Sequence, residues 1–146
     1  MGPFGGVTLD SVGNLYGTTF IGGNQGCPLP NGNGCGTIYK LDKTGKETML
    51  YRWKANSPSE YDPFAGLVRD QQGNLYGATE YGGNFNCGGG TGCGTIFKLD
   101  TRGKLTVLHT FNDGNDGAYP RYRLFMDGQG DLYGANVSGT LFEITP

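Results

Sequence analysis

GNLYG at residues 13–17 returns unchanged at residues 73–77, and it returns once more as GDLYG at residues 130–134. The copies are therefore offset by 60 residues (73 − 13) and by 57 residues (130 − 73). Self-similarity at a spacing of this size is typical of repeat proteins, in which each unit is one supersecondary structure. The class of fold therefore follows from the structure of a single unit.

The match extends well beyond these five residues. PFGGVTLDSVGNLYGTTFIGG begins the first unit and PFAGLVRDQQGNLYGATEYGG begins the second. Each leads through a cysteine-containing segment into CGTIYKLDKTGKETMLYRW or CGTIFKLDTRGKLTVLHTF, and the third unit reads PRYRLFMDGQGDLYGANVSGTLFEITP. These matches divide a single domain, 1–146, into units at residues 3–62, 63–119 and 120–146.

Each complete unit predicts four short antiparallel strands separated by tight turns. Apolar and polar residues alternate in TIYKL, as expected for a half-buried strand. The 29 glycines among 146 residues disfavour helices, since each costs about 1 kcal/mol at a helical position relative to Ala. The 9 Tyr and 8 Phe are too many aromatic residues for a disordered chain. The expected strands end at Asp10, include residues 14–17, and span 36–41 and 47–53; their counterparts end at Asp70, include 74–77, and span 94–99 and 105–111.

A repeated four-stranded antiparallel unit predicts an all-β fold of the β-propeller class. A flat β-sandwich is the alternative, but repetition of whole four-strand units disfavours it. The third unit supplies only three strands and lacks the outer one, so the chain holds about three blades. Because propellers close with about 4–8 blades, we expect homodimerisation into a six-bladed ring; otherwise the chain is a piece of a longer propeller.

The motif P-x-x-G-L-x-x-D-x-x-G-N-L-Y-G-T-T, followed by G-T-I-F-K-L, resembles the bacterial GloVer tandem repeat of "choice-of-anchor" surface proteins. The resemblance covers the whole chain and is complete at residues 3–53 and 63–111. In the third unit Asp131 replaces the asparagine, and the Gly-Gly pair and the cysteine segment are missing. The resemblance implies a secreted or anchored β-propeller and implies no particular catalytic activity.

Four cysteines form two close pairs, Cys27 with Cys35 and Cys87 with Cys93. A zinc site would favour tighter Cys-x2-Cys spacing or several histidines, and His109 is the only histidine. Two loop disulfides are therefore favoured, with four free thiols as the alternative. Since disulfides persist in oxidising compartments, we expect an extracellular, cell-surface or periplasmic protein.

Charge and hydropathy exclude two classes of partner. The 11 Lys and Arg are balanced by 13 Asp and Glu, so the basic surface that nucleic acids require is missing. No apolar run approaches the roughly 20 residues of a membrane-spanning helix. The expected partners are a second copy of the chain and a carbohydrate ligand, with no nucleic acid, no membrane span and no cofactor.

Strand polarity predicts where a ligand would bind. In an antiparallel meander successive connections alternate between the two ends of the sheet, so the tight turns share one end and the long loops share the other. Function commonly resides on such loops, and residues that depart from the repeat are better candidates than the repeated tyrosines, which we expect to pack between blades. An extracellular module that binds glycans or another surface ligand needs aromatic faces and polar groups. The candidates are Arg52, Trp53, Tyr61, Glu80, Tyr81, His109 and Asp113.

Two other functions remain open. A glycoside hydrolase needs two converging carboxyl groups, one with a raised pKa, and Glu80 is the first candidate. Its partner would be Asp113, Asp116, Glu60 or Asp62. A structural repeat with no activity of its own is the third possibility.

The segment NDGNDG at residues 112–117 resembles half of a calcium loop. Asp113, Asn115 and Asp116 would be its ligands, but the distal bidentate glutamate is missing. An Asx-rich turn is therefore the favoured interpretation, and no metal is expected.

Overall fold

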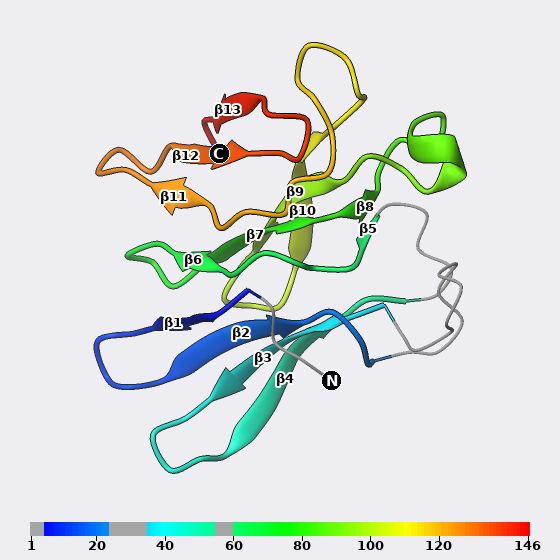
Figure 1. The fold of residues 1–146 in the computed structure, drawn as a ribbon. Helices are drawn as coiled ribbons and strands as arrows, with labels where there is room; N and C mark the ends of the chain where they lie inside the picture. The colour runs from blue at the N-terminus through cyan, green and yellow to red at the C-terminus, as the bar shows by residue number, and fades with distance from the viewer. Residues whose placement is uncertain (1–4, 24–34, 55–59) are drawn as a thin grey trace.

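A computed structural model of the chain describes residues 5–23, 35–54 and 60–146. The described strands form three antiparallel sheets and one small two-stranded sheet (Figure 1). The prediction of an all-β fold is confirmed, and the only described helix is the single-turn η1 (Gly88–Gly90). Within the described residues, no helix has the length and apolar character needed to cross a membrane.

The strands occupy the segments that the repeat predicts. The first sheet has the order β1-β2-β3-β4, the second β6-β7-β9-β10 and the third β11-β12-β13. Their bounds are β1 (Val7–Leu9), β2 (Leu15–Thr19), β3 (Thr37–Leu41), β4 (Glu47–Arg52), β6 (Val68–Arg69), β7 (Leu75–Thr79), β9 (Thr95–Leu99), β10 (Leu105–Thr110), β11 (Phe125–Met126), β12 (Leu132–Ala135) and β13 (Leu141–Ile144). The two four-stranded sheets also share a register shift in the outermost strand pair, so the repeat extends to local irregularities.

The fourth sheet was not expected from the sequence. It pairs β5 (Glu60–Tyr61) with β8 (Tyr81–Gly82) in antiparallel register, so that Tyr61 lies opposite Tyr81. The pairing joins the segment that enters the second sheet to the segment that leaves β7. It therefore fixes a contact at the end of the sheets that carries the long loops.

Side chains between neighbouring sheets form the core. One cluster lies between the first and second sheets and includes Tyr16, Ile38, Trp53 and Phe97. A second cluster lies between the second and third sheets, and its members are Ala65, Val68, Tyr76, Ala78, Cys87, Cys93, Ile96, Phe111, Ala118, Leu124 and Leu132. The predicted packing role of the repeated tyrosines is therefore seen at Tyr16 and Tyr76.

The glycine of the LYG motif has a packing reason. A Cβ atom at Gly77 would lie 2.6 Å from the Phe97 ring, and one at Gly134 would lie 2.3 Å from the Phe142 ring. Both distances are far below van der Waals contact, so the aromatic side chain of the neighbouring strand occupies the space that a side chain would need.

A repeated aspartate holds each first turn together. In the second sheet, Asp70 accepts hydrogen bonds from the backbone and side-chain nitrogens of Asn74 at 2.8 and 2.7 Å and from the Tyr76 hydroxyl at 3.0 Å. Asp10 makes the same set of bonds in the first sheet. There the hydrogen bond from the Asn14 side chain is the main reason why the pKa of Asp10 lies below its usual range. The D-x-x-G-N-L-Y motif therefore encodes a turn and the strand that follows it.

Figure 1 shows the β1–β2, β3–β4 and β6–β7 turns at one end of the sheets and the segment around η1 at the other. This arrangement follows from the strand polarity that the sequence predicts. We call the first end the turn end and the second the loop end.

Candidate functional site

The β5–β8 pairing places two carboxyl groups next to each other at the loop end. Asp62 directly follows Tyr61 and Glu80 directly precedes Tyr81, so the two acidic residues form the next pair of this antiparallel register. The backbone nitrogen of Glu80 donates to the carbonyl oxygen of Asp62 at 3.0 Å. Two carboxyl groups in these positions would repel each other if both were ionised.

Asp62 is fully buried, with a 0% exposed fraction. Neither carboxyl oxygen has a hydrogen-bond partner within the part of the chain that the structure describes. Burial, together with the nearby negative charge of Glu80, raises the pKa of Asp62 to about 8. The Asp62 side chain therefore holds its proton at neutral pH.

Glu80 is buried and forms an ion pair with Arg121, whose Nη2 donates to its Oε1. The Arg121 side chain remains 43% exposed, and its guanidinium lies 5.6 Å from the centre of the Phe64 ring. The hydrogen bond to Glu80 raises the pKa of Arg121. Arg121 is thus fixed on one side by a carboxylate and an aromatic ring and is open to solvent on the other.

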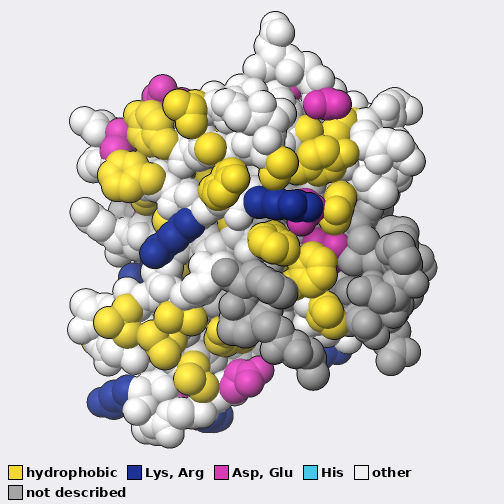
Figure 2. Space-filling model, in the orientation of Figure 1, with side chains coloured by type: hydrophobic (Ala, Val, Ile, Leu, Met, Phe, Trp, Pro, Cys, Tyr) yellow, Lys and Arg dark blue, Asp and Glu magenta, His cyan; other side chains and the backbone are white. Residues whose placement is uncertain are grey.

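Tyr81 completes the group. Burial, followed by its hydrogen bond to Glu80, raises the pKa of the Tyr81 hydroxyl, and its ring packs edge-to-face on Tyr119 at 5.9 Å. We call Asp62, Phe64, Glu80, Tyr81 and Arg121 the Glu80–Arg121 site. Figure 2 shows one face of the molecule, on which a cationic side chain is bordered by hydrophobic ones.

The repeat shows which features of this site belong to the scaffold. Tyr119 occupies the same repeat position as Asp62, and both residues have a positive φ, 59° for Tyr119 and 61° for Asp62. The Asp62 nitrogen donates to the carbonyl oxygen of Cys35, just as the Tyr119 nitrogen donates to that of Cys93. The backbone geometry is repeated while the side chain is not, so the scaffold does not require a carboxyl group at position 62.

The ion pair also departs from the repeat. Glu80 corresponds to Phe20, and Arg121 corresponds to Phe64. Between the first and second sheets these positions hold the Phe20–Phe64 ring pair, with centroids 5.6 Å apart. Between the second and third sheets the ion pair replaces the aromatic pair. The two interfaces therefore hold different side-chain pairs at the same two repeat positions.

The structure separates most of the predicted ligand-binding residues. Of the predicted set, Glu80 and Tyr81 lie in the Glu80–Arg121 site. Trp53 was expected on the loop surface but is fully buried, because it packs edge-to-face on Tyr51 and Phe97 between two sheets. Arg52 is exposed at the end of β4, where its Nε donates to the Met49 sulfur. The side chain of Tyr61 lies outside the described residues.

His109 and Asp116 form their own pair. The Nε2 atom of His109 lies 3.0 Å from Oδ2 of Asp116, and the His109 ring packs on Phe111. Asp113 is exposed on the neighbouring loop. Asp116 is paired with His109, whereas Asp62 interacts with Glu80 electrostatically. The structure thus places Asp62 beside Glu80, and the side chain of Glu60 lies outside the described residues.

The calcium candidate forms a closed turn. The Asp113 nitrogen donates to the Gly117 carbonyl oxygen at 3.1 Å, and the Asn136 side chain donates to the Asp116 carbonyl oxygen at 2.8 Å. Asp116 is already paired with His109. These contacts agree with an Asx-rich turn. Asn115 is exposed.

The disulfide prediction is confirmed for Cys87 and Cys93. Cys35 is disulfide-bonded as well, and its predicted partner, Cys27, lies outside the described residues. The Asp113 carboxylate approaches the Cys87 and Cys93 sulfurs, but disulfide sulfurs offer no thiolate for a metal.

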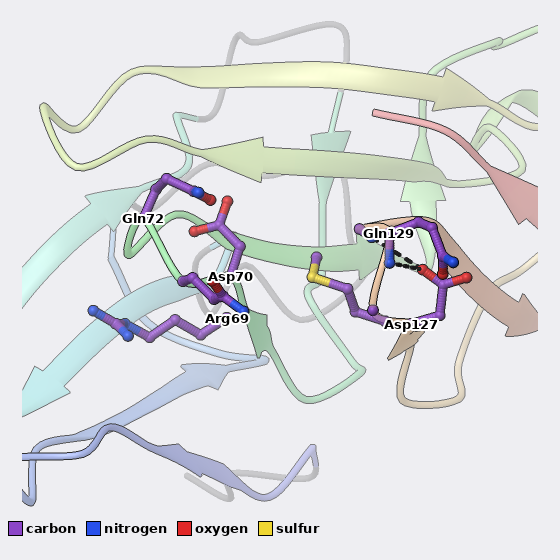
Figure 3. Close-up of a pocket in the computed structure, with 9 residues that line it drawn as sticks. Arg69, Asp70, Gln72, Asp127 and Gln129 are labelled. Atoms are coloured by element: carbon purple, nitrogen blue, oxygen red, sulfur yellow. Dashed lines mark hydrogen bonds between the residues drawn. The ribbon is translucent and has the colours of Figure 1, made fainter.

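A cavity of about 310 Å³ lies at the turn end, lined by residues 69–72 and 126–130 (Figure 3). Asp127 points toward its own turn, where its Oδ1 accepts the backbone nitrogens of Gln129 and Gly130. Asp70 is similarly engaged by Asn74 and Tyr76. The acidic groups of this cavity therefore serve the turns, and the Glu80–Arg121 site remains the stronger candidate.

No family model and no curated protein matches this chain. Among solved structures, the chain is similar to a luciferin-regenerating enzyme, with a TM-score of 0.57 and 20% sequence identity over 96% of the chain. It is also similar to a protein assigned as a gluconolactonase, with a TM-score of 0.49 and 17% identity over 96% of the chain. The chain spans 41% and 47% of these two proteins. The first likeness shows the fold alone, and the chain has a propeller-like all-β fold.

Proposed function

We propose that the protein is an extracellular propeller module that binds carbohydrate at the Glu80–Arg121 site. In this proposal each sheet is one blade, the blades are GloVer-type repeats, and a homodimer closes them into a six-bladed ring. The Cys87–Cys93 disulfide supports an oxidising compartment. The observation that carries the binding function is the Glu80–Arg121 ion pair, whose arginine side chain is 43% exposed and which occupies the positions where the other interface holds an aromatic pair.

The chemistry of the site suits a sugar. A guanidinium offers planar N–H donors that can engage two neighbouring oxygens, and Arg121 is held in place by Glu80 and Phe64. Tyr81 adds an aromatic face with a polar tip, the amphipathic surface that suits one face of a pyranose ring. Because Asp62 is protonated, the three side chains of Asp62, Glu80 and Arg121 together carry no net charge. The site therefore favours neutral hydroxyl groups.

Replacing Arg121 tests the binding site. We expect Arg121→Gln to weaken binding of an oligosaccharide identified on a glycan array by about ten- to hundredfold, since hydrogen bonds to a charged group contribute about 1.5–3 kcal/mol. Isothermal titration calorimetry measures the change. Arg102→Gln is the matched control, because Arg102 is also paired with a carboxylate, that of Asp100, but lies in a β9–β10 turn that the site does not include. Equal affinities for wild type and Arg121→Gln would refute the assignment.

A second candidate function is glycoside hydrolysis. It is favoured by the adjacency of a buried carboxyl group that holds its proton, Asp62, and a carboxylate, Glu80. These are the protonation states of a general acid and of a nucleophile or base. A reducing-sugar assay on the polysaccharide that contains the bound oligosaccharide distinguishes the two functions.

The hydrolase predicts turnover that both Glu80→Gln and Asp62→Asn abolish, while Asp113→Asn retains it. Binding without turnover supports the binding module instead. A protein that neither binds nor hydrolyses would leave only the structural role of the repeats.

A further inference from the structure

The outward faces of the first and third sheets carry residue types that are buried elsewhere in the same repeat. On the third sheet, Leu141 is 81% exposed, although its counterparts Ile38 and Ile96 are buried between sheets. Phe125 on β11 is 65% exposed, whereas its counterpart Val68 is buried. Tyr133 occupies the same repeat position as Tyr16 and Tyr76, which each pack against the next sheet. We call Phe125, Tyr133 and Leu141 the leading face.

The opposite face of the first sheet shows the complementary pattern. Leu9 on β1 is 65% exposed, and Val7 beside it is also exposed. Their counterparts in the second sheet are Arg69 and Leu67, which meet the first sheet: Leu67 is buried in that core cluster, and the Arg69 guanidinium lies 5.7 Å from the Tyr16 ring. We call Val7 and Leu9 the trailing face.

Two internal interfaces show how these faces fit. In each, the equivalents of the leading face pack on the equivalents of the trailing face in the next sheet. The leading and trailing faces therefore consist of side chains at the positions that the repeat uses for packing one sheet on the next. Exposed clusters of large apolar side chains mark interaction surfaces.

We propose that the leading face of one copy docks on the trailing face of a second copy, and that the same contact forms in return. This head-to-tail arrangement has twofold symmetry and two identical junctions. It rests on the proposal that the sheets are propeller blades, because six such sheets match a propeller of ordinary size. A second copy is the occupant that fits, because each junction reproduces the packing that the chain already shows twice.

The mass in solution tests the proposal. Multi-angle light scattering of the wild type is expected to give twice the 15.5 kDa chain mass. Leu141→Lys and Leu9→Lys are each expected to give the single-chain mass, because each damages both junctions. Both side chains are mostly exposed, so the substitutions leave the fold intact, as circular dichroism would verify. Phe85→Lys is the control, since Phe85 is a partly exposed apolar residue in the segment that precedes η1.

Mixing the two variants tests the head-to-tail geometry. A dimer of one Leu141→Lys chain and one Leu9→Lys chain has one junction with both substitutions and one junction with none. We therefore expect the mixture to recover dimer that neither variant forms alone. Dimers of Leu9→Lys by itself would instead indicate contact between two leading faces and would overturn the proposal.

Two further results would overturn it. A wild-type protein with the single-chain mass would mean that the faces meet other segments, such as further repeats of a longer protein. A mass that rises beyond two chains with concentration would mean an open assembly. A monomeric wild type that binds carbohydrate would refute the docking proposal but not the binding function. A dimer that binds no carbohydrate would refute the binding function but not the docking proposal.

Discussion

The free energy of unfolding is expected to fall by up to about 1.4 kcal/mol for each pH unit between about pH 5 and pH 7.5 because of Asp62. The folded state raises the pKa of this carboxyl from 3.8 to about 8. Above pH 5 the unfolded chain has already released the proton, while the folded chain still holds it. The folded state therefore binds more protons, and its stability is lost as the pH rises toward 8.

Asp62→Asn is expected to remove this slope and to be more stable than the wild type at pH 8, because the amide stays neutral. Urea unfolding at several pH values measures both effects. Asp113→Asn is the matched control: it makes the same chemical change at an exposed residue that also has a positive φ, and it should keep the wild-type slope. Parallel pH profiles for wild type and Asp62→Asn would contradict the buried, protonated Asp62.

Phe97→Ala is expected to reduce the free energy of unfolding by about 3–5 kcal/mol, the usual loss for a buried phenylalanine. Phe97 is fully buried, packs edge-to-face on Trp53 at 5.4 Å, and fills the space beside Gly77. Gly77 has no side chain that could fill the cavity. Chemical denaturation measures the loss, and Phe97→Leu should show a smaller one.

The same repeat position offers an internal comparison. Phe142 lies beside Gly134 as Phe97 lies beside Gly77, but it is only partly buried because β13 is the last strand of a three-stranded sheet. Phe142→Ala should therefore be less destabilising than Phe97→Ala. A larger loss for Phe142→Ala would mean that the third sheet contributes more to stability than its packing indicates.

The repeat made the sheets predictable. D-x-x-G-N-L-Y fixes a turn and a strand through local hydrogen bonds between residues four to six positions apart. A sequence motif can encode bonds over such short separations, so the turn and the strand can be predicted from it. The β5–β8 pairing was not predictable, because it joins segments 20 residues apart with only two residues in each strand. It depends on how the whole repeat packs.

The site was only partly predictable. Glu80 stood out because a glutamate replaces Phe20 of the first unit, and the structure shows it in an ion pair. Arg121 carried the same signal, an arginine where Phe64 stands in the second unit, and was missed because its partner lies 41 residues away in the sequence. Trp53 differs from its counterpart Phe111 in the sequence, but both are fully buried aromatic side chains at the same repeat position, so the difference does not mark a surface site.

A crystal structure with a bound oligosaccharide, chosen from the glycan array, tests the binding function most directly. We expect sugar hydroxyl groups within hydrogen-bond distance of the Arg121 guanidinium and a sugar ring against Tyr81. Sugar bound instead in the turn-end cavity of Asp70 and Asp127, with the Glu80–Arg121 site uncovered, would contradict it.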